Sequence, residues 1–202
     1  MKLRCGHCQV QMTVPFFALV AFLLLSDPSG TAACGILAAL LHELGHLCAM
    51  HLERRPVQAV RLTAFGAEIR AQACEGAYWR DACVFLAGPA VNFILFALLS
   101  MHARAFAQPQ MLHVFAVANG LLGACNLLPV EPLDGGQALL CALQEKLPRA
   151  KAVRVVQITS FLTIVPLAVL GLLTLFRSRW NFTLLLMAVY LLFLLMCKPN
   201  RA

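Results

Sequence analysis

The feature that most constrains this chain is a histidine–glutamate–histidine cluster inside a long apolar run. His42-Glu43-Leu44-Gly45-His46 follows the uncharged residues 31–41 and precedes the mostly apolar residues 47–52. Two histidines four positions apart on a helix project from one face about one turn apart, which is the spacing of a zinc site. The glutamate beside the first histidine is placed to accept a proton from an attacking water. The motif therefore predicts a zinc-dependent hydrolytic site within a membrane span.

Composition supports a membrane location. Apolar residues make up 61% of the 202 residues and charged residues only 12%, about half the share usual in soluble domains. We expect one all-α polytopic domain over residues 1–202, with residues 1–11 as a cytoplasmic tail and the turn Asp27-Pro28-Ser29-Gly30 between the first two spans. Six spans have about the length that a bilayer requires, namely residues 12–26, 31–51, 82–101, 111–128, 152–176 and 180–197.

The segment between the second and third spans differs from the rest of the chain. Residues 57–70 alternate weakly between apolar and polar types around Phe65-Gly66, which predicts a short β-hairpin-like element at the membrane surface. The open edge of such a hairpin would accept an extended substrate as an added strand. An amphipathic connector lying on lipid is the alternative interpretation.

The distribution of basic residues predicts the orientation. With six spans, only Arg104, Arg177 and Arg179 of the 16 lysines and arginines fall on the side opposite the termini. The positive-inside rule then places both termini in the cytoplasm. The net charge of +7 is explained by this topology and by attraction to anionic lipid of the bilayer, so it calls for no nucleic-acid partner.

The cysteines do not indicate a disulfide scaffold. Their number, nine, is odd, and several lie in apolar spans where a free thiol behaves as a small hydrophobic group. Cys5-Gly6-His7-Cys8 could be half of a zinc site or a redox pair. Because no second pair with ligand spacing follows, a reduced thiol-containing tail is the favoured interpretation.

A zinc site needs a third protein ligand, and Asp134 is the main candidate. It ends the segment Asn126-Leu127-Leu128-Pro129-Val130-Glu131-Pro132-Leu133-Asp134, in which two prolines interrupt any helix, and two glycines follow it. Irregular backbone at membrane depth is tolerated only where it is buried in protein or lines a wet cavity. Asp134 also lies at a predicted helix start, where a carboxylate is favoured. The last two spans, by contrast, lack Asp, Glu, His, Lys and Arg over 157–176 and 181–197, so we expect no chemistry from them.

Three motifs give the chain a resemblance to a known family. The chain resembles the site-2 protease family of intramembrane zinc metalloproteases, and its small size, six spans and lack of a PDZ insertion resemble the stage IV sporulation protein FB-like branch. The motifs are His42-Glu43-x-x-His46, Ala87-Gly88-Pro89-Ala90-x-Asn92, and Asn126-x-x-Pro129-x-x-Pro132-x-Asp134-Gly135.

The resemblance implies a role for each matching residue. His42, His46 and Asp134 would bind one catalytic zinc ion, and Glu43 would be the general base. Asn126 and Pro132 would lie near the substrate, with Asn126 bonding the scissile peptide or its oxyanion; the alternative is that Asn126 caps a broken helix. We expect Gly88, Pro89 and Asn92 to support the site.

The resemblance also implies a biological setting. The substrate would be a membrane-associated pro-protein, such as a sporulation sigma-factor precursor, and inhibitory membrane proteins would be partners. The protein would be integral to a bacterial cell or forespore membrane. Two other functions stay open, a membrane metal-ion transporter and an inactive protease-like scaffold. A transporter predicts several sites along the membrane normal, whereas the sequence shows one cluster at one depth.

Overall fold

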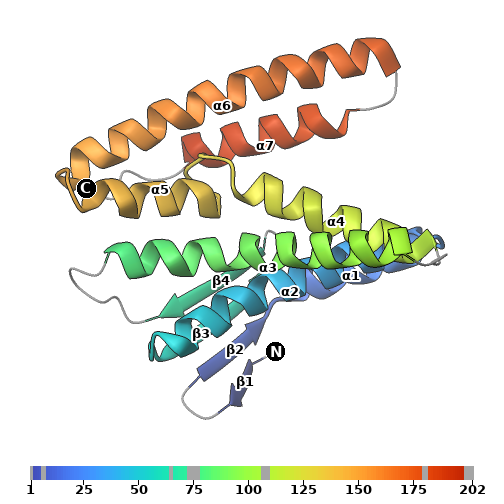
Figure 1. Cartoon of the computed structure of the whole chain (residues 1–202), viewed down its shortest axis with the longest axis horizontal. Helices are drawn as coiled ribbons and strands as arrows, with labels where there is room; N and C mark the ends of the chain where they lie inside the picture. The colour runs from blue at the N-terminus through green and yellow to red at the C-terminus, as the bar shows by residue number, and fades with distance from the viewer. Residues whose placement is uncertain are drawn as a thin grey trace. The chain divides into compact units, whose positions relative to one another are not determined.

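The computed structural model describes residues 2–5, 8–63, 66–71, 78–105, 110–178 and 182–197 (Figure 1). The described chain is mainly helical, with a small sheet near its start. The helices are α1 Val14–Ser26, α2 Thr31–Leu52, α3 Tyr78–Ala105, α4 Gln110–Asn126, α5 Asp134–Gln144, α6 Arg149–Ser178 and α7 Thr183–Cys197, and the strands are β1 Lys2–Cys5, β2 Cys8–Met12, β3 Val57–Thr63 and β4 Gly66–Ala71.

The chain divides into two compact units. The first comprises Met1–Ala124 and the second Cys125–Ala202, so the boundary falls in the last turn of α4. The expectation of a single domain over residues 1–202 stays a prediction.

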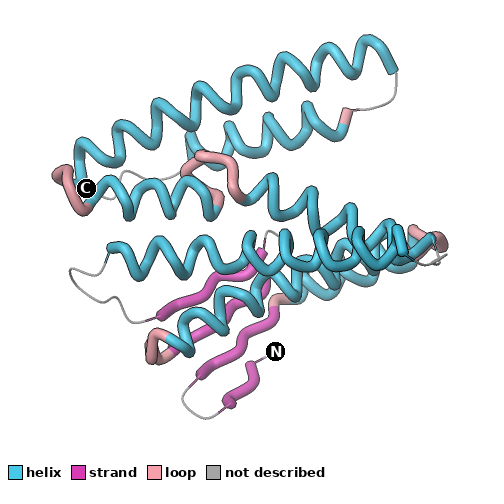
Figure 2. Tube along the Cα trace, viewed as in Figure 1, coloured by secondary structure: helices cyan, strands magenta, loops and turns pink. Residues whose placement is uncertain are grey.

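The first unit contains a four-stranded sheet with the strands in chain order (Figure 2). β3 pairs antiparallel with β4, so two antiparallel strands occupy the segment predicted to be hairpin-like. β2 pairs parallel with β3 and antiparallel with β1. Much of residues 1–11, expected to be a cytoplasmic tail, forms these two strands, which the sequence did not predict, and the cytoplasmic location stays a prediction. The location of this sheet at the membrane surface stays a prediction.

The first unit is held together by close packing of α2 on α3. A Cβ atom on Gly45 of α2 would lie 2.9 Å from the carbonyl oxygen of Ala87 and 3.2 Å from the Cα atom of Gly88, both in α3. Small residues allow helix backbones to approach this closely, which is the usual packing mode of helices in membranes. Only a glycine at position 45 fits this crossing, and the crossing brings the motif histidines against α3.

The second unit consists of α5, α6 and α7. α6 and α7 run side by side (Figure 1), and α5 packs on α6. Their core is formed by Val130, Ile164 and Leu191, which are almost fully buried. A Cβ atom on Gly171 would lie 2.7 Å from the backbone nitrogen of Leu185, so α6 and α7 also meet through a small residue.

The predicted spans correspond closely to helices, although their number as membrane crossings stays a prediction. Among the described residues, α2, α3 up to His102, and α6 are long and apolar enough to cross a bilayer, and α1 and α7 are shorter apolar helices. Large apolar side chains on these helices are exposed, including Phe22, Leu162 and Phe193. A soluble monomer rarely exposes so much apolar surface, so the exterior is suited to lipid.

Candidate metal centre

His42 and His46 lie together on the buried face of α2. Their side chains are almost fully buried, and the two imidazole rings meet edge to face with centroids 4.8 Å apart. The Nε2 atoms of the two rings are 3.2 Å apart. Two nitrogen ligands of one tetrahedral zinc ion would be about 3.3 Å apart, since each Zn–N bond is about 2.05 Å. The two side chains therefore fit one zinc ion.

The remaining ring nitrogens are held by α3. The Nδ1 atom of His42 is 2.6 Å from Oδ1 of Asn92, and the Nδ1 atom of His46 is 2.8 Å from the backbone oxygen of Val84. Since a carbonyl oxygen can only accept, His46 carries its proton on Nδ1, which leaves the lone pair of Nε2 available to a metal. Ligating histidines are usually oriented by a hydrogen bond at their second nitrogen. Asn92, expected as support, contacts a motif histidine directly.

Gly88 and Pro89 make room for the histidines within α3. A Cβ atom on Gly88 would overlap Nε2 of His46 and would lie 2.8 Å from Cε1 of His42. Pro89 is fully buried and lies inside the helix, where its missing N–H leaves one carbonyl of the preceding turn without its intrahelical bond. These two residues therefore act on the shape of α3 and on the space beside it that the two histidines occupy. Glu43 follows His42 on α2 and is half-buried.

Asp134 lies in the second unit, as the first residue of α5. Before it, the chain folds back on the first turn of that helix. Cβ atoms on Gly135 and Gly136 would overlap the backbone carbonyls of Leu127 and Val130, respectively. These two glycines are therefore required for the local path of the chain, and that path fixes where the half-buried Asp134 side chain begins.

Two hydroxyl groups of α6 contact the same loop. Ser160 Oγ accepts a hydrogen bond from the backbone N–H of Glu131 at 2.9 Å. Thr159 Oγ1 donates mainly to the oxygen of Val156 in its own helix at 2.9 Å and lies 3.4 Å from the oxygen of Pro129. The side chain of Gln137 in α5 donates to the oxygen of Glu131. The fifth span was expected to carry no chemistry of its own, and α6, which occupies it, braces the segment that carries Asp134. Adjacent hydroxyl residues in an apolar span were the sequence signal.

Asn126 and Pro132 occupy the two ends of this loop. Asn126 is the last residue of α4 and Pro132 lies in the turn before Asp134, and both are half-buried. Their predicted contact with substrate stays a prediction. Of the Cys5-Gly6-His7-Cys8 element, Gly6 and His7 lie outside the described residues, and Cys5 and Cys8 are described only as backbone positions of β1 and β2.

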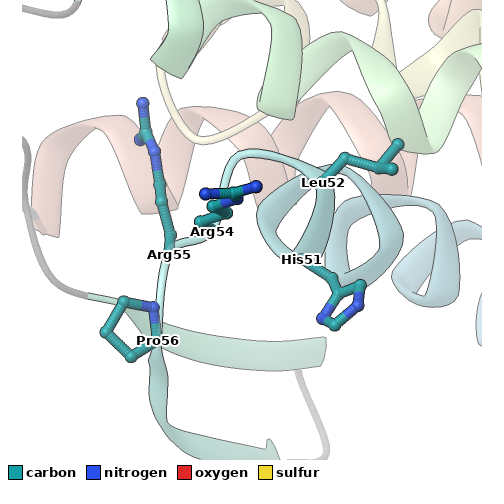
Figure 3. A pocket seen from close by; sticks show the side chains of 5 residues that line it. All are labelled: His51, Leu52, Arg54, Arg55 and Pro56. Carbon is teal, nitrogen blue, oxygen red and sulfur yellow. The ribbon is translucent and has the colours of Figure 1, made fainter.

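A separate pocket of about 540 Å³ lies at the end of α2 (Figure 3). It is lined by His51, Leu52, Arg54, Arg55 and Pro56. Arg54, which follows the C-cap residue Glu53, has a φ of 54°, and the N–H of Arg55 donates to the oxygen of Met50 at 2.9 Å. The lining is basic and apolar and includes none of the residues predicted for catalysis, so this pocket is not the metal site.

Comparisons with known proteins agree with the resemblance seen in the motifs. Residues 100–167 match the model of peptidase family M50. This stretch contains Asp134 but does not include His42 or His46. The chain is 29% identical over 143 residues to stage IV sporulation protein FB of Bacillus subtilis (strain 168), covering 69% of this chain and 50% of that protein. It is 30% identical over 116 residues to a Synechocystis protein named provisionally as a zinc metalloprotease, covering 52% and 31%.

The chain thus spans half or less of these two relatives' length. The solved structure of the site-2 protease from Methanocaldococcus jannaschii matches with a TM-score of 0.68 at 20% identity, over all of this chain and 96% of that one. At this identity the likeness establishes the fold. The chain therefore has the fold of the Methanocaldococcus jannaschii site-2 protease, contains a stretch that matches peptidase family M50, and is similar in sequence to stage IV sporulation protein FB and to a protein named provisionally as a zinc metalloprotease.

Proposed function

We propose that this chain is an intramembrane zinc metalloendopeptidase. The observation that carries the proposal is the pair of Nε2 atoms 3.2 Å apart on α2, with the opposite nitrogens of both rings engaged by α3. This arrangement suits a metal ion better than it suits a structural cluster in which the polar atoms only hydrogen-bond to one another. The apolar helix around it and the relatives among metalloproteases support a site within the bilayer.

We propose Asp134 as the third ligand. Its support is the motif in which it stands, its place inside the matched M50 region, and the loop that Gly135, Gly136 and Ser160 fix before α5. Two imidazoles and one carboxylate leave a fourth tetrahedral position open, as catalytic zinc sites do. Two imidazole nitrogens and one carboxylate oxygen suit zinc better than they suit metals that prefer oxygen ligands alone.

The roles of the chain's own residues follow. Zinc, when bound, supplies Lewis-acid polarisation of the scissile carbonyl and a lower pKa for water. Glu43 accepts the proton of the attacking water and returns it to the leaving amine. Asn126 donates a hydrogen bond to the developing oxyanion. Pro132 shapes the substrate cleft, and β4, an outer strand of the described sheet, pairs with an extended substrate segment.

The finer assignments rest on sequence. Six spans with both termini in the cytoplasm would place the motif histidines in the cytoplasmic half of α2. The substrate would be a membrane-associated pro-protein, and the Bacillus subtilis relative makes a sporulation sigma-factor precursor the first one to test, with the forespore membrane as the setting. Inhibitory membrane proteins would be partners. A metal transporter is disfavoured because the described residues offer one histidine pair at one depth.

Purified protein and its Glu43→Gln and Asp134→Asn variants test the proposal. Each is assayed for zinc content and for cleavage of a co-expressed membrane pro-protein, with the new N-terminus sequenced. Glu43→Gln should keep zinc and lose cleavage, whereas Asp134→Asn should lose both. Glu53→Gln, which alters an acidic residue at the end of the same helix, is the matched control and should cleave normally. Cleavage by Glu43→Gln at the wild-type rate would refute the assignment, and zinc-loaded wild type without cleavage would favour the inactive scaffold.

A further inference from the structure

A chain of buried amides leads away from His42 through two neighbouring helices. Asn92 of α3 lies 2.6 Å from Nδ1 of His42, and its Nδ2 donates to Oδ1 of Asn119 in α4 at 2.9 Å. Nδ2 of Asn119 in turn donates to the backbone oxygen of Phe115 at 2.9 Å. Both asparagines are fully buried. Neither the motifs nor the family resemblance drew attention to Asn119.

The two ends of this chain determine its direction. The oxygen of Phe115 can only accept, so the amide nitrogen of Asn119 faces it and the amide oxygen faces Asn92. The amide oxygen of Asn119 needs a donor, so the amide nitrogen of Asn92 faces Asn119. The same nitrogen of Asn92 also donates to the oxygen of Ala38 at 3.3 Å. The oxygen of Asn92 is then left for His42, whose Nδ1 must carry the proton.

We propose that Asn119 is a positioning residue for the metal centre, because it fixes the orientation of the Asn92 amide and thereby the His42 tautomer that exposes Nε2. The inference rests on the proposed function, because that function requires Nε2 of His42 to be available to zinc. If Asn92 were free to rotate by 180°, its nitrogen would face His42 and would favour the tautomer with the proton on Nε2. That tautomer cannot bind a metal through Nε2.

If Asn119 had only a structural role, substituting it would remove buried polar contacts between α3 and α4 without changing the His42 tautomer. The two possibilities differ in what each substitution does. Asn119→Leu keeps the number and branching of the side-chain heavy atoms but removes the acceptor for Asn92. Asn119→Asp keeps the acceptor for Asn92. A buried carboxyl group becomes neutral, so it can donate to the oxygen of Phe115 while it accepts from Asn92. Gly120→Ala disturbs the same helix contact without touching the amides, since its Cβ would lie 2.9 Å from the ring of Phe96.

The experiment measures metal binding and the tautomer separately in full-length protein in detergent. Zinc affinity comes from competition with a chelator, and ligand geometry from the visible absorption of the cobalt-substituted protein. The ring-nitrogen ¹⁵N shifts of His42, assigned by their loss in His42→Gln, report the tautomer without metal. Losing an orienting partner costs about 10–100-fold in metal affinity, and we expect about tenfold for Asn119→Leu. We also expect a changed cobalt spectrum and a mixed His42 tautomer for this variant.

The variants separate the outcomes. Asn119→Asp should bind zinc within about threefold of wild type, and Asn119→Leu should add less than about twofold in an Asn92→Leu background, because coupled residues are not additive. Wild-type affinity and tautomer in Asn119→Leu, or an equal cobalt change in Gly120→Ala, would overturn the inference. If wild type bound no zinc, the proposed function would fail, while the metal-free ¹⁵N shifts would still decide whether Asn119 sets the tautomer.

Discussion

Gly88 lies so close to His46 that no side chain can be added to it without displacing the imidazole. Its absent Cβ would overlap Nε2 of His46, the atom proposed to bind zinc, and would also meet His42. The histidine pair therefore depends on α3 as much as on its own helix. The histidine pair of the proposed metal centre is a product of the α2–α3 crossing, at which Gly45 and Gly88 face each other.

Gly88→Ala should therefore impair both metal binding and stability. Overpacking of this kind costs about 1–3 kcal/mol of stability, and displacement of an imidazole should lower zinc affinity by at least about tenfold. Chelator competition and thermal denaturation in detergent measure the two effects. Gly35→Ala in α2 is the control, because a Cβ there meets nothing within 4 Å. It should bind zinc normally and should be no less stable than wild type. Unchanged zinc affinity in Gly88→Ala would contradict this account of the centre.

Gly136→Ala should reduce activity through the loop before Asp134 in the second unit. The new Cβ would overlap the carbonyl group of Val130, and since this contact is with backbone, the loop before Asp134 must move. We expect loss of most peptidase activity, with the hydrogen bonds of His42 and His46 to α3 unaffected. Cleavage of a pro-protein and the His42 ¹⁵N shifts measure these two consequences. Full activity in Gly136→Ala would show that the path of this loop does not fix the catalytic position of Asp134.

Much of the fold followed from the apolar runs, because a helix in lipid must satisfy its own backbone and therefore fills each run. The observed α2 and the predicted second span differ by one residue at the end. The strands at Lys2–Cys5 and Cys8–Met12 were missed, since β2 depends on a parallel partner that comes much later in the chain. The helix from Asp134 to Gln144 was anticipated only at its start.

The site shows the same division. The spacing of His42 and His46 is a local property, and the sequence revealed it fully. Asn92 was expected as support without a partner, because its contact with His42 depends on how two helices cross. Asn119 and Ser160 were overlooked for the same reason. A single polar residue in an apolar helix has no periodicity, and its role becomes visible only when its neighbours on other helices are known.

Two ion pairs beside the sheet should differ widely in their effect on stability. The guanidinium of Arg55 contacts the carboxylate of Asp81, and its side chain is only 7% exposed. Arg80 and Glu53 are 3.5 Å apart, with Arg80 65% exposed. Removing one partner of a buried pair costs about 3–5 kcal/mol, whereas exposed pairs contribute about 0–1 kcal/mol.

Asp81→Ala should accordingly destabilise the protein by roughly 2–4 kcal/mol, allowing for partial exposure of Asp81, and Glu53→Ala by less than about 1 kcal/mol. Denaturant titration of the metal-free protein in detergent, followed by circular dichroism, gives both values. Equal effects of the two substitutions would mean that the buried pair contributes no more than the exposed one.

The turn between α1 and α2 should respond to acid through Asp27. Hydrogen bonds from the Ser29 hydroxyl and from the Ala32 backbone N–H, the latter at 2.5 Å, lower the pKa of Asp27 below its ordinary value of 3.8. A carboxyl group with a lowered folded-state pKa adds stability above its unfolded pKa, and this stability is lost as the pH falls through the folded value. The difference in melting temperature between wild type and Asp27→Ala, measured without metal, should thus be constant from pH 7 to about pH 5 and shrink towards pH 3. A difference that stays constant down to pH 3 would mean that the charge of Asp27 does not hold this turn.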